Sequence, residues 1–131
     1  MKRVILAILV VFVLWSVLDF VVHGLILAPA YQKTASLWRP MGEMKTGLYY
    51  LTVLISAIVF VSLYALFFAR RGVWTALAYG FIFGLGAGIS MGYGTYSFMP
   101  IPYHMALTWF LGTLAKITLG GICLGLIVRK V

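Results

Sequence analysis

Apolar residues form four long runs along the chain, separated by short polar or proline-containing segments. The runs cover residues 4–28, 46–69, 73–98 and 103–128. Each is close to the roughly 20 residues that cross the hydrocarbon core of a bilayer as a helix. Because an unpaired backbone amide is costly in lipid, we expect all four to be helical. The pattern therefore predicts an all-α fold, an integral membrane four-helix bundle forming a single domain over residues 1–131.

The connections between the runs differ in length. Residues 70–72 and 99–102 are short, so the helices that they join are expected to be antiparallel neighbours. Residues 29–45 form the one long outer loop. Four apolar residues in and after this loop recur at helical spacing, namely Leu37, Met41, Met44 and Leu48. Because Pro40 also suits a first helical turn, the second helix is expected to begin near Pro40, outside the membrane.

Composition and charge agree with a membrane protein. The 131 residues are 64% hydrophobic and only 9% charged, whereas a soluble domain has about a quarter charged residues. The net charge of +8 comes from ten Lys and Arg against two acids, and the bases lie mostly at the ends of apolar runs. This distribution does not predict a nucleic-acid partner. The single cysteine, Cys123, lies in an apolar run and cannot form an internal disulfide.

The distribution of basic residues predicts the orientation. The N-terminal side of the bundle collects Lys2, Arg3, Arg70, Arg71, Arg129 and Lys130. The opposite side collects Lys33, Arg39 and Lys45. Six bases against three predict that the N- and C-termini are both cytoplasmic. The expected outer aromatic belt consists of Tyr31, Trp38, Tyr49 and Tyr50, and Trp74 lies on the inner side.

Two charges lie inside apolar runs. Asp19 is 16 residues from Arg3, or about 24 Å along a helix, and Lys116 is 13 residues from Arg129, or about 20 Å. Both charges are thus expected at nearly the same depth, where an unpaired charge costs a few kcal/mol. We predict a buried ion pair between Asp19 and Lys116 that fixes helix packing. The alternative is a proton or ion relay.

Two histidines and four methionines are candidate ligands. His23 lies one turn after Asp19, and His104 begins the fourth run, so both imidazoles are expected at the outer level. With Asp19 they would form a small metal site, or the two histidines would hold haem b. The alternative is that His23 bonds to Asp19 and His104 lies in the headgroup region. A copper(I) site is a further hypothesis, with soft sulfur ligands from Met41, Met44, Met99 and Met105.

The third run is rich in glycine. Gly80, Gly84, Gly88 and Gly92 recur at every fourth position, and Gly86, Ser90 and Gly94 extend the small surface. Such small residues allow another helix to approach closely. Gly121 and Gly125 in the fourth run offer a matching surface, but a second subunit is an equally open partner for the track.

Three stretches together resemble a group of known sequences. They are Asp19-Phe-Val-Val-His-Gly24, Leu37-Trp-Arg-Pro-Met41 and the glycine-rich residues 84–94. They resemble uncharacterised small bacterial four-helix membrane proteins of the domain-of-unknown-function type. That resemblance implies the fold and a multi-pass location in the bacterial inner membrane, and it transfers no site.

A weaker likeness is to small multidrug exporters, in which Asp19 would match the acid that binds substrate and protons. Lys116 departs from that pattern, because a lysine beside the acid would repel cationic drugs. The long outer loop departs from it as well.

These observations lead to three functional hypotheses. The first is a non-catalytic accessory or scaffold subunit of a larger membrane assembly or homo-oligomer, packing through its glycine-lined face and without a cofactor. The second is a proton-coupled small transporter that uses Asp19. The third is an electron-transfer subunit that binds haem or a metal through His23 and His104. No sequence motif for nucleophilic or metal-dependent catalysis is present, so an enzyme is not expected.

Overall fold

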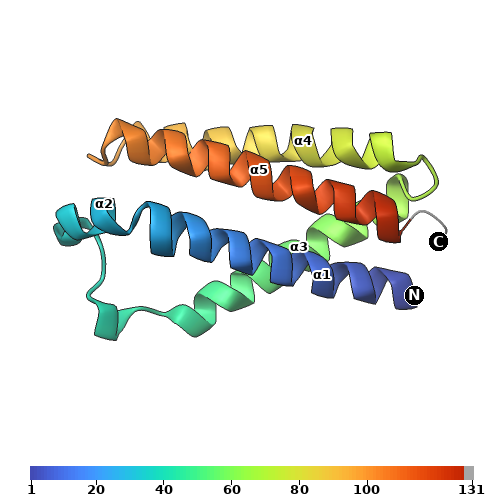
Figure 1. The fold of residues 1–131 in the computed structure, drawn as a ribbon, viewed down its shortest axis with the longest axis horizontal. Helices are drawn as coiled ribbons and strands as arrows, with labels where there is room; N and C mark the ends of the chain where they lie inside the picture. Colours follow the sequence, from blue (N-terminus) through green and yellow to red (C-terminus); the bar gives the residue numbers. More distant parts are fainter. Residues whose placement is uncertain (129–131) are drawn as a thin grey trace.

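The computed structural model describes residues 1–128, and Figure 1 shows long helices packed side by side. Throughout this part of the chain the regular secondary structure is helical. The long elements are α1 (Lys2–Asp19) with its π-helical continuation η1 (Phe20–Ile26), α3 (Thr46–Phe67), α4 (Val73–Ile89) with the π-helical η4 (Ser90–Gly94), and α5 (Tyr103–Ile127). The spans Lys2–Ile26, Thr46–Phe67, Val73–Gly94 and Tyr103–Ile127 are each long and apolar enough to cross a membrane.

The expected outer loop is partly helical. After η1 the chain changes direction at Leu27 and forms a short helix, α2 (Ala28–Lys33), with Pro29 in its first turn. A 3₁₀ turn, η2 (Ala35–Leu37), follows. Leu27 and Ala30 are buried against Ile101, which precedes α5, and against Met105 and Ala106 in the first turn of α5. This apolar contact gives the segment a packed face, and so it is ordered as a helix rather than left as a loop.

The prediction that the second helix begins near Pro40 is wrong. Pro40 has extended backbone angles, and only a 3₁₀ turn, η3 (Met41–Glu43), follows it. Met44 is extended again, and α3 begins at Thr46. Leu37 packs against the buried cluster at the start of α5, but Met41 is 88% exposed and Met44 is 45% exposed, so the stripe has no continuous packed face. A short helix without a packed face is marginal, which explains why the periodicity here does not produce one.

Helix α5 has the central position in the bundle. It packs against α4 along most of its length and against α1 on another face. In Figure 1, α4 and α5 lie side by side, and the N-terminal end of α1 lies at the same end of the molecule as the turn from α3 to α4. That turn needs Gly72, whose φ of +87° is in the left-handed region favoured by glycine.

The glycine track of α4 and η4 is buried against α5. A methyl group built on Gly80 would lie 2.7 Å from the Ile117 carbonyl oxygen, and one on Gly88 would lie 2.9 Å from the Phe110 carbonyl oxygen. On the facing helix, a methyl group on Gly121 would lie 2.5 Å from the Ala76 carbonyl oxygen. Gly84, Gly92 and Gly125 make similar close approaches between the two helices. The track therefore packs within the chain, and the expectation that this face meets another subunit is corrected.

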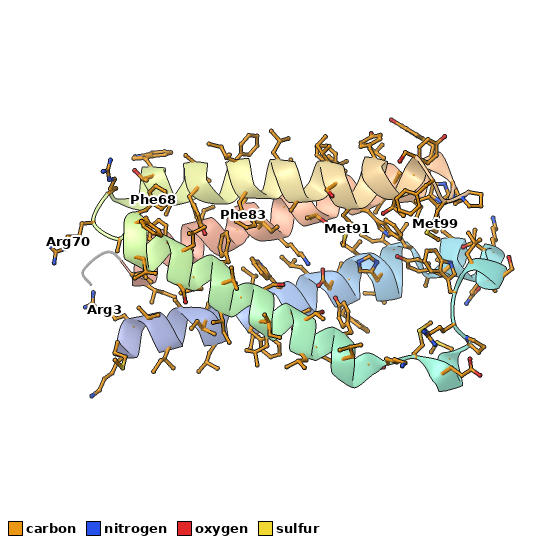
Figure 2. All side chains as sticks on the ribbon, turned by 180° about the vertical axis from the view of Figure 1, so that it is seen from behind. Arg3, Phe68, Arg70, Phe83, Met91 and Met99 are labelled. Atoms are coloured by element: carbon orange, nitrogen blue, oxygen red, sulfur yellow. The ribbon has the colours of Figure 1, made fainter. Side chains whose placement is uncertain are left out.

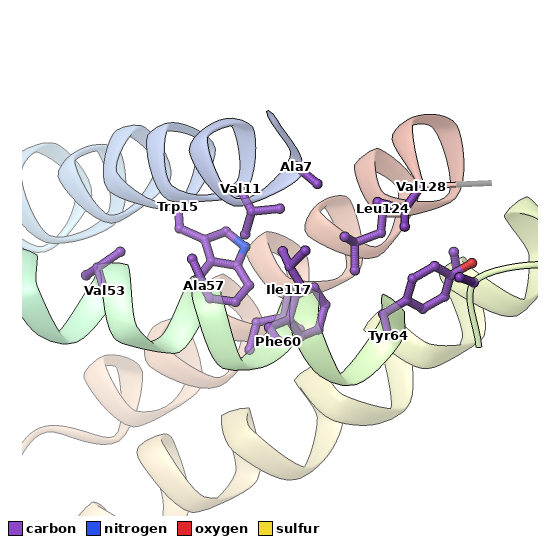
Figure 3. Close-up of a cluster of buried hydrophobic side chains, with 13 residues drawn as sticks. Ala7, Val11, Trp15, Val53, Ala57, Phe60, Tyr64, Ile117, Leu124 and Val128 are labelled. Carbon is purple, nitrogen blue, oxygen red and sulfur yellow. The ribbon is translucent and has the colours of Figure 1, made fainter. Parts of the chain in front are cut away.

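Aromatic side chains connect α3 to the rest of the bundle. Phe60 and Tyr64 of α3 are almost fully buried, and Phe60 packs on Trp15 of α1 with ring centroids 5.1 Å apart. Tyr79 of α4 stacks near both α3 rings and donates a hydrogen bond of 2.7 Å to the Phe60 carbonyl oxygen. Figure 3 shows this core with Trp15, Phe60 and Ile117 grouped between the helices.

The first turns of α3 are less packed than the rest of the helix. All residues from 46 to 52 are exposed, and burial begins at Val53. In Figure 1 this part of α3 diverges from the other helices toward the segment that connects α2 to α3, residues 34–45. One side chain, Tyr49, nevertheless reaches back into the bundle, as described below.

Adding a methyl group at the helix interface should destabilise the protein. Gly121→Ala places a carbon against the backbone of α4 and is expected to cost about 1–3 kcal/mol through overpacking. Gly86→Ala is the matched control, because nothing lies within 4 Å of its added methyl group. Unfolding in detergent, followed by circular dichroism, measures both. Equal stability of the two variants would contradict the close α4–α5 contact.

Candidate functional site

An aspartate and a lysine from two helices meet inside the bundle. Asp19 is the last residue of α1, and Lys116 lies near the middle of α5. The Lys116 Nζ atom lies 2.9 Å from Oδ1 and 3.0 Å from Oδ2 of Asp19. The side chain of Lys116 is 19% exposed and that of Asp19 is 9% exposed. The structure thus brings together the two residues that the depth argument paired.

Two aromatic side chains complete the surroundings of these charges. Tyr49 of α3 donates a hydrogen bond of 2.5 Å from its hydroxyl to Oδ2 of Asp19. Trp15 lies one turn before Asp19, and its Nε1 donates to the Lys116 carbonyl oxygen over 2.9 Å. The Trp15 ring centroid is 5.7 Å from Lys116 Nζ, within the range of a cation–π interaction. Three helices, α1, α3 and α5, therefore converge on one carboxylate.

A second polar cluster lies further along the first span. The His23 Nδ1 atom of η1 and the Tyr31 hydroxyl of α2 are 2.6 Å apart, and Trp109 Nε1 of α5 donates to the same hydroxyl over 2.7 Å. Trp38 packs edge-on against Tyr31 and Trp109 and donates from Nε1 to Thr34 Oγ1. This cluster attaches α2 and the following turn to α5.

The donors and acceptors of the second cluster determine where its protons lie. An indole N–H can only donate, so the Tyr31 oxygen accepts from Trp109. Burial raises the pKa of Tyr31 to about 12, so its hydroxyl keeps its own proton at neutral pH. That proton is satisfied when Tyr31 donates to Nδ1 of His23. The cluster therefore favours the neutral His23 tautomer that carries its proton on Nε2.

The structure does not gather the expected metal ligands. Asp19 is engaged by Lys116 and Tyr49, His23 bonds to Tyr31 rather than to Asp19, and His104 is exposed in the first turn of α5. Residues 1–128 contain no group of three or more His, Cys, Asp or Glu side chains placed to hold a metal ion. The three-ligand site from Asp19, His23 and His104 is therefore not supported, and haem binding remains an untested prediction.

The four methionines of the copper hypothesis lie in different surroundings. Met105 is fully buried in the apolar cluster between α2 and α5, and Met99 packs against that cluster. Met41 and Met44 lie in the segment that connects α2 to α3, where they are 88% and 45% exposed. The buried methionines act as apolar packing residues, which is their usual role.

The sequence predicts an aromatic belt that includes Tyr31, Trp38 and Tyr49, and it predicts no site that includes Trp109. In the structure all four belong to the two polar clusters. One signal could have indicated a further donor to Asp19, because an ionised carboxylate can accept more hydrogen bonds than a single ammonium group fills. Nothing in the sequence indicates which tyrosine donates this hydrogen bond to Asp19, because the donor depends on how α3 packs against α1.

Comparisons of the chain with protein-family models, curated proteins and solved structures found no match.

Removing one member of the Asp19–Lys116 contact should destabilise the bundle strongly. Lys116→Met leaves a buried carboxylate without its cation and is expected to cost about 3 kcal/mol, and Asp19→Asn leaves the ammonium group without its counter-charge. The double variant should lose less stability than the sum of the two single variants. Unfolding by denaturing detergent measures this cycle. Lys45→Met, at an exposed lysine, is the control; additive losses would contradict a coupled pair.

Tyr31→Phe should disrupt the second cluster, because it leaves both Trp109 Nε1 and His23 Nδ1 without their shared partner. The expected cost is roughly 1–3 kcal/mol for each unsatisfied buried group. Nitrogen NMR of the wild-type histidine should show the proton of His23 on Nε2. Tyr50→Phe, at an exposed tyrosine, should leave both the stability and the His23 spectrum unchanged. A proton on Nδ1 in the wild-type protein would contradict the assignment.

Proposed function

We propose that the chain is a multi-pass membrane protein of a bacterial inner membrane, with both termini in the cytoplasm. Four helices of suitable length and hydropathy support the insertion. Among the described residues, Lys2, Arg3, Arg70 and Arg71 lie at one end and Lys33, Arg39 and Lys45 at the other. The two further bases used in the sequence argument, Arg129 and Lys130, lie outside the described residues. The excess of bases at the first end supports its cytoplasmic location.

Within that membrane, the protein acts as a small, non-catalytic accessory subunit. The observation that carries this proposal is the engagement of Asp19 by Lys116 and by Tyr49. A charge pair that is already neutralised is a poor donor or acceptor of protons for a substrate. It instead fixes the positions of three helices relative to one another, as a structural role requires.

A small-residue surface remains for a partner helix on the other side of α4. Gly86 and Ser90 are exposed, and Gly94 continues the same face into η4. A methyl group on Gly86 would have nothing within 4 Å. Because α5 occupies the track of Gly80 to Gly92, this second stripe is the surface through which the subunit packs against a larger assembly or another copy.

Gly86→Leu should release the partner while the chain itself stays folded. The protein is purified in mild detergent from its own membrane, and the mass of the complex is measured on native gels. Gly47→Leu in α3 is the matched control, since this glycine is also open and helical. The proposal predicts a smaller particle for Gly86→Leu alone. A wild-type particle with the mass of a single chain would contradict it.

A proton-coupled transporter is the second candidate. Two observations favour it: Tyr49 reaches the charge pair from a segment of α3 that is otherwise exposed, and the Lys116 side chain retains 19% exposure. Movement of that segment would open the pair to a substrate.

The two candidate functions differ in the response to Asp19→Asn. In proteoliposomes with a pH gradient, a transporter shows coupled flux in the wild type and loses it in this variant. An accessory subunit shows no flux in either form.

A further inference from the structure

Two π-helical segments flank α5 near the contact between Asp19 and Lys116. Segment η1 begins directly after Asp19 and contains His23, which lies one turn further along the chain. Segment η4 contains Met91, whose sulfur atom accepts a hydrogen bond of 3.9 Å from Thr113 Oγ1 of α5, one turn before Lys116. Short π-helical segments occur frequently at functional sites. The surroundings of Lys116 are therefore a candidate ligand site.

The polar side chains at this position have more hydrogen-bond donors than their contacts within residues 1–128 use. An ammonium group has three N–H donors, and the two Asp19 oxygens accept two of those of Lys116. Tyr31 occupies Nδ1 of His23, so the Nε2–H is the remaining donor of that ring. His23 lies close enough to Asp19 and Lys116 to interact electrostatically with both. Since His23 and Lys116 are both partly exposed, a ligand that accepts hydrogen bonds can reach them.

The charges at the site favour a neutral ligand. An anion that approached Lys116 would be repelled by the carboxylate of Asp19, which lies 2.9 Å from the Lys116 Nζ atom. A cation would be repelled by the ammonium group itself. A carbonyl oxygen carries no net charge and only accepts hydrogen bonds. The group that fits the remaining donors is therefore a neutral carbonyl.

Aromatic and sulfur-containing side chains lie on the helices around these donors. The Trp15 ring centroid is 5.7 Å from the Lys116 Nζ atom, and Tyr49, which reaches the ion pair from α3, is 41% exposed. Met91 and Phe83, which Figure 2 labels on η4 and α4, are 51% and 39% exposed. Aromatic rings and thioether groups make favourable contacts with a flat aromatic or quinonoid ring. We therefore expect the carbonyl group of the ligand to belong to a planar ring.

We propose that this site binds a lipid-soluble quinone. One ring carbonyl accepts hydrogen bonds from Lys116 Nζ and His23 Nε2, the ring lies beside Trp15 and Tyr49, and the apolar tail extends into the bilayer. Asp19 keeps its contacts with Lys116 and Tyr49 when the quinone binds. Entry of the quinone from the bilayer requires the proposed membrane location, on which this inference rests.

The first test compares two histidine variants of the full chain in mild detergent, with decylubiquinone as the probe and microscale thermophoresis as the measurement. His23→Asn removes the Nε2–H donor, whereas the amide oxygen of Asn can still accept a hydrogen bond from Tyr31. This variant should bind decylubiquinone about tenfold more weakly, which is the effect of one lost hydrogen bond. His104→Asn, at the exposed histidine of α5, is the matched control and should bind like the wild type.

The second test varies the ligand and uses only the wild-type chain, so it does not depend on the stability of any variant. Decylbenzene has the same tail and a planar ring but no carbonyl group, and it should bind at least about tenfold more weakly than decylubiquinone. Dioctanoylglycerol has ester carbonyls but no ring, and it should also bind more weakly. Nitrogen NMR of the histidines should show that decylubiquinone shifts the Nε2 signal of His23 and leaves His104 unchanged.

Four outcomes would overturn the inference: no binding of decylubiquinone to the wild type, equal affinity of His23→Asn, an equal loss in His104→Asn, or equal binding of decylbenzene. Equal binding of dioctanoylglycerol would also overturn it, since the site would then recognise a lipid ester. Alkaline extraction of membranes tests the proposed membrane location separately. Release of the wild-type chain by alkali would contradict both proposals, whereas a retained chain that binds no quinone would contradict only the quinone site.

Discussion

The contact between Asp19 and Lys116 is the constraint on which the arrangement of the bundle depends. An apolar environment does not tolerate either charge alone, so each helix must place its charge where the other can reach it. With Tyr49 as a third contributor, the requirement extends from α1 and α5 to α3. The aromatic core around Phe60 of α3 and Tyr79 of α4 lies between this pair and the turn from α3 to α4.

Two kinds of interaction stabilise the bundle. Helices α4 and α5 associate through glycines, whose missing side chains allow backbone atoms to approach closely. Helices α1 and α3 instead join the bundle through large aromatic rings and through hydrogen bonds to charged or polar groups. The first kind holds two helices together along their length. The second kind acts at particular points, which leaves the first turns of α3 exposed apart from the Tyr49 contact with Asp19.

The two ends of the molecule have different chemistry. At the end of α2 and the start of α5, the aromatic and histidine side chains form an internally bonded cluster around Tyr31. At the end where α3 turns into α4, the charged groups are Arg70 and Arg71, which are both exposed. The closed polar cluster around Tyr31 fits a structural role, because its polar groups satisfy one another.

The lengths of the four apolar runs, the short turns between them and the matching depths of Asp19 and Lys116 follow from the sequence, because they depend only on local hydropathy and on the rise of a helix. The partner of the glycine track, the short α2 helix and the roles of Tyr49 and Trp109 do not. Each of these depends on which helix faces which, and a hydropathy pattern is the same for a face that meets lipid, another helix of the chain or a second protein. The tertiary structure decides which surface each face contacts, because α5 packs on α4 and the first turns of α3 diverge from the other helices.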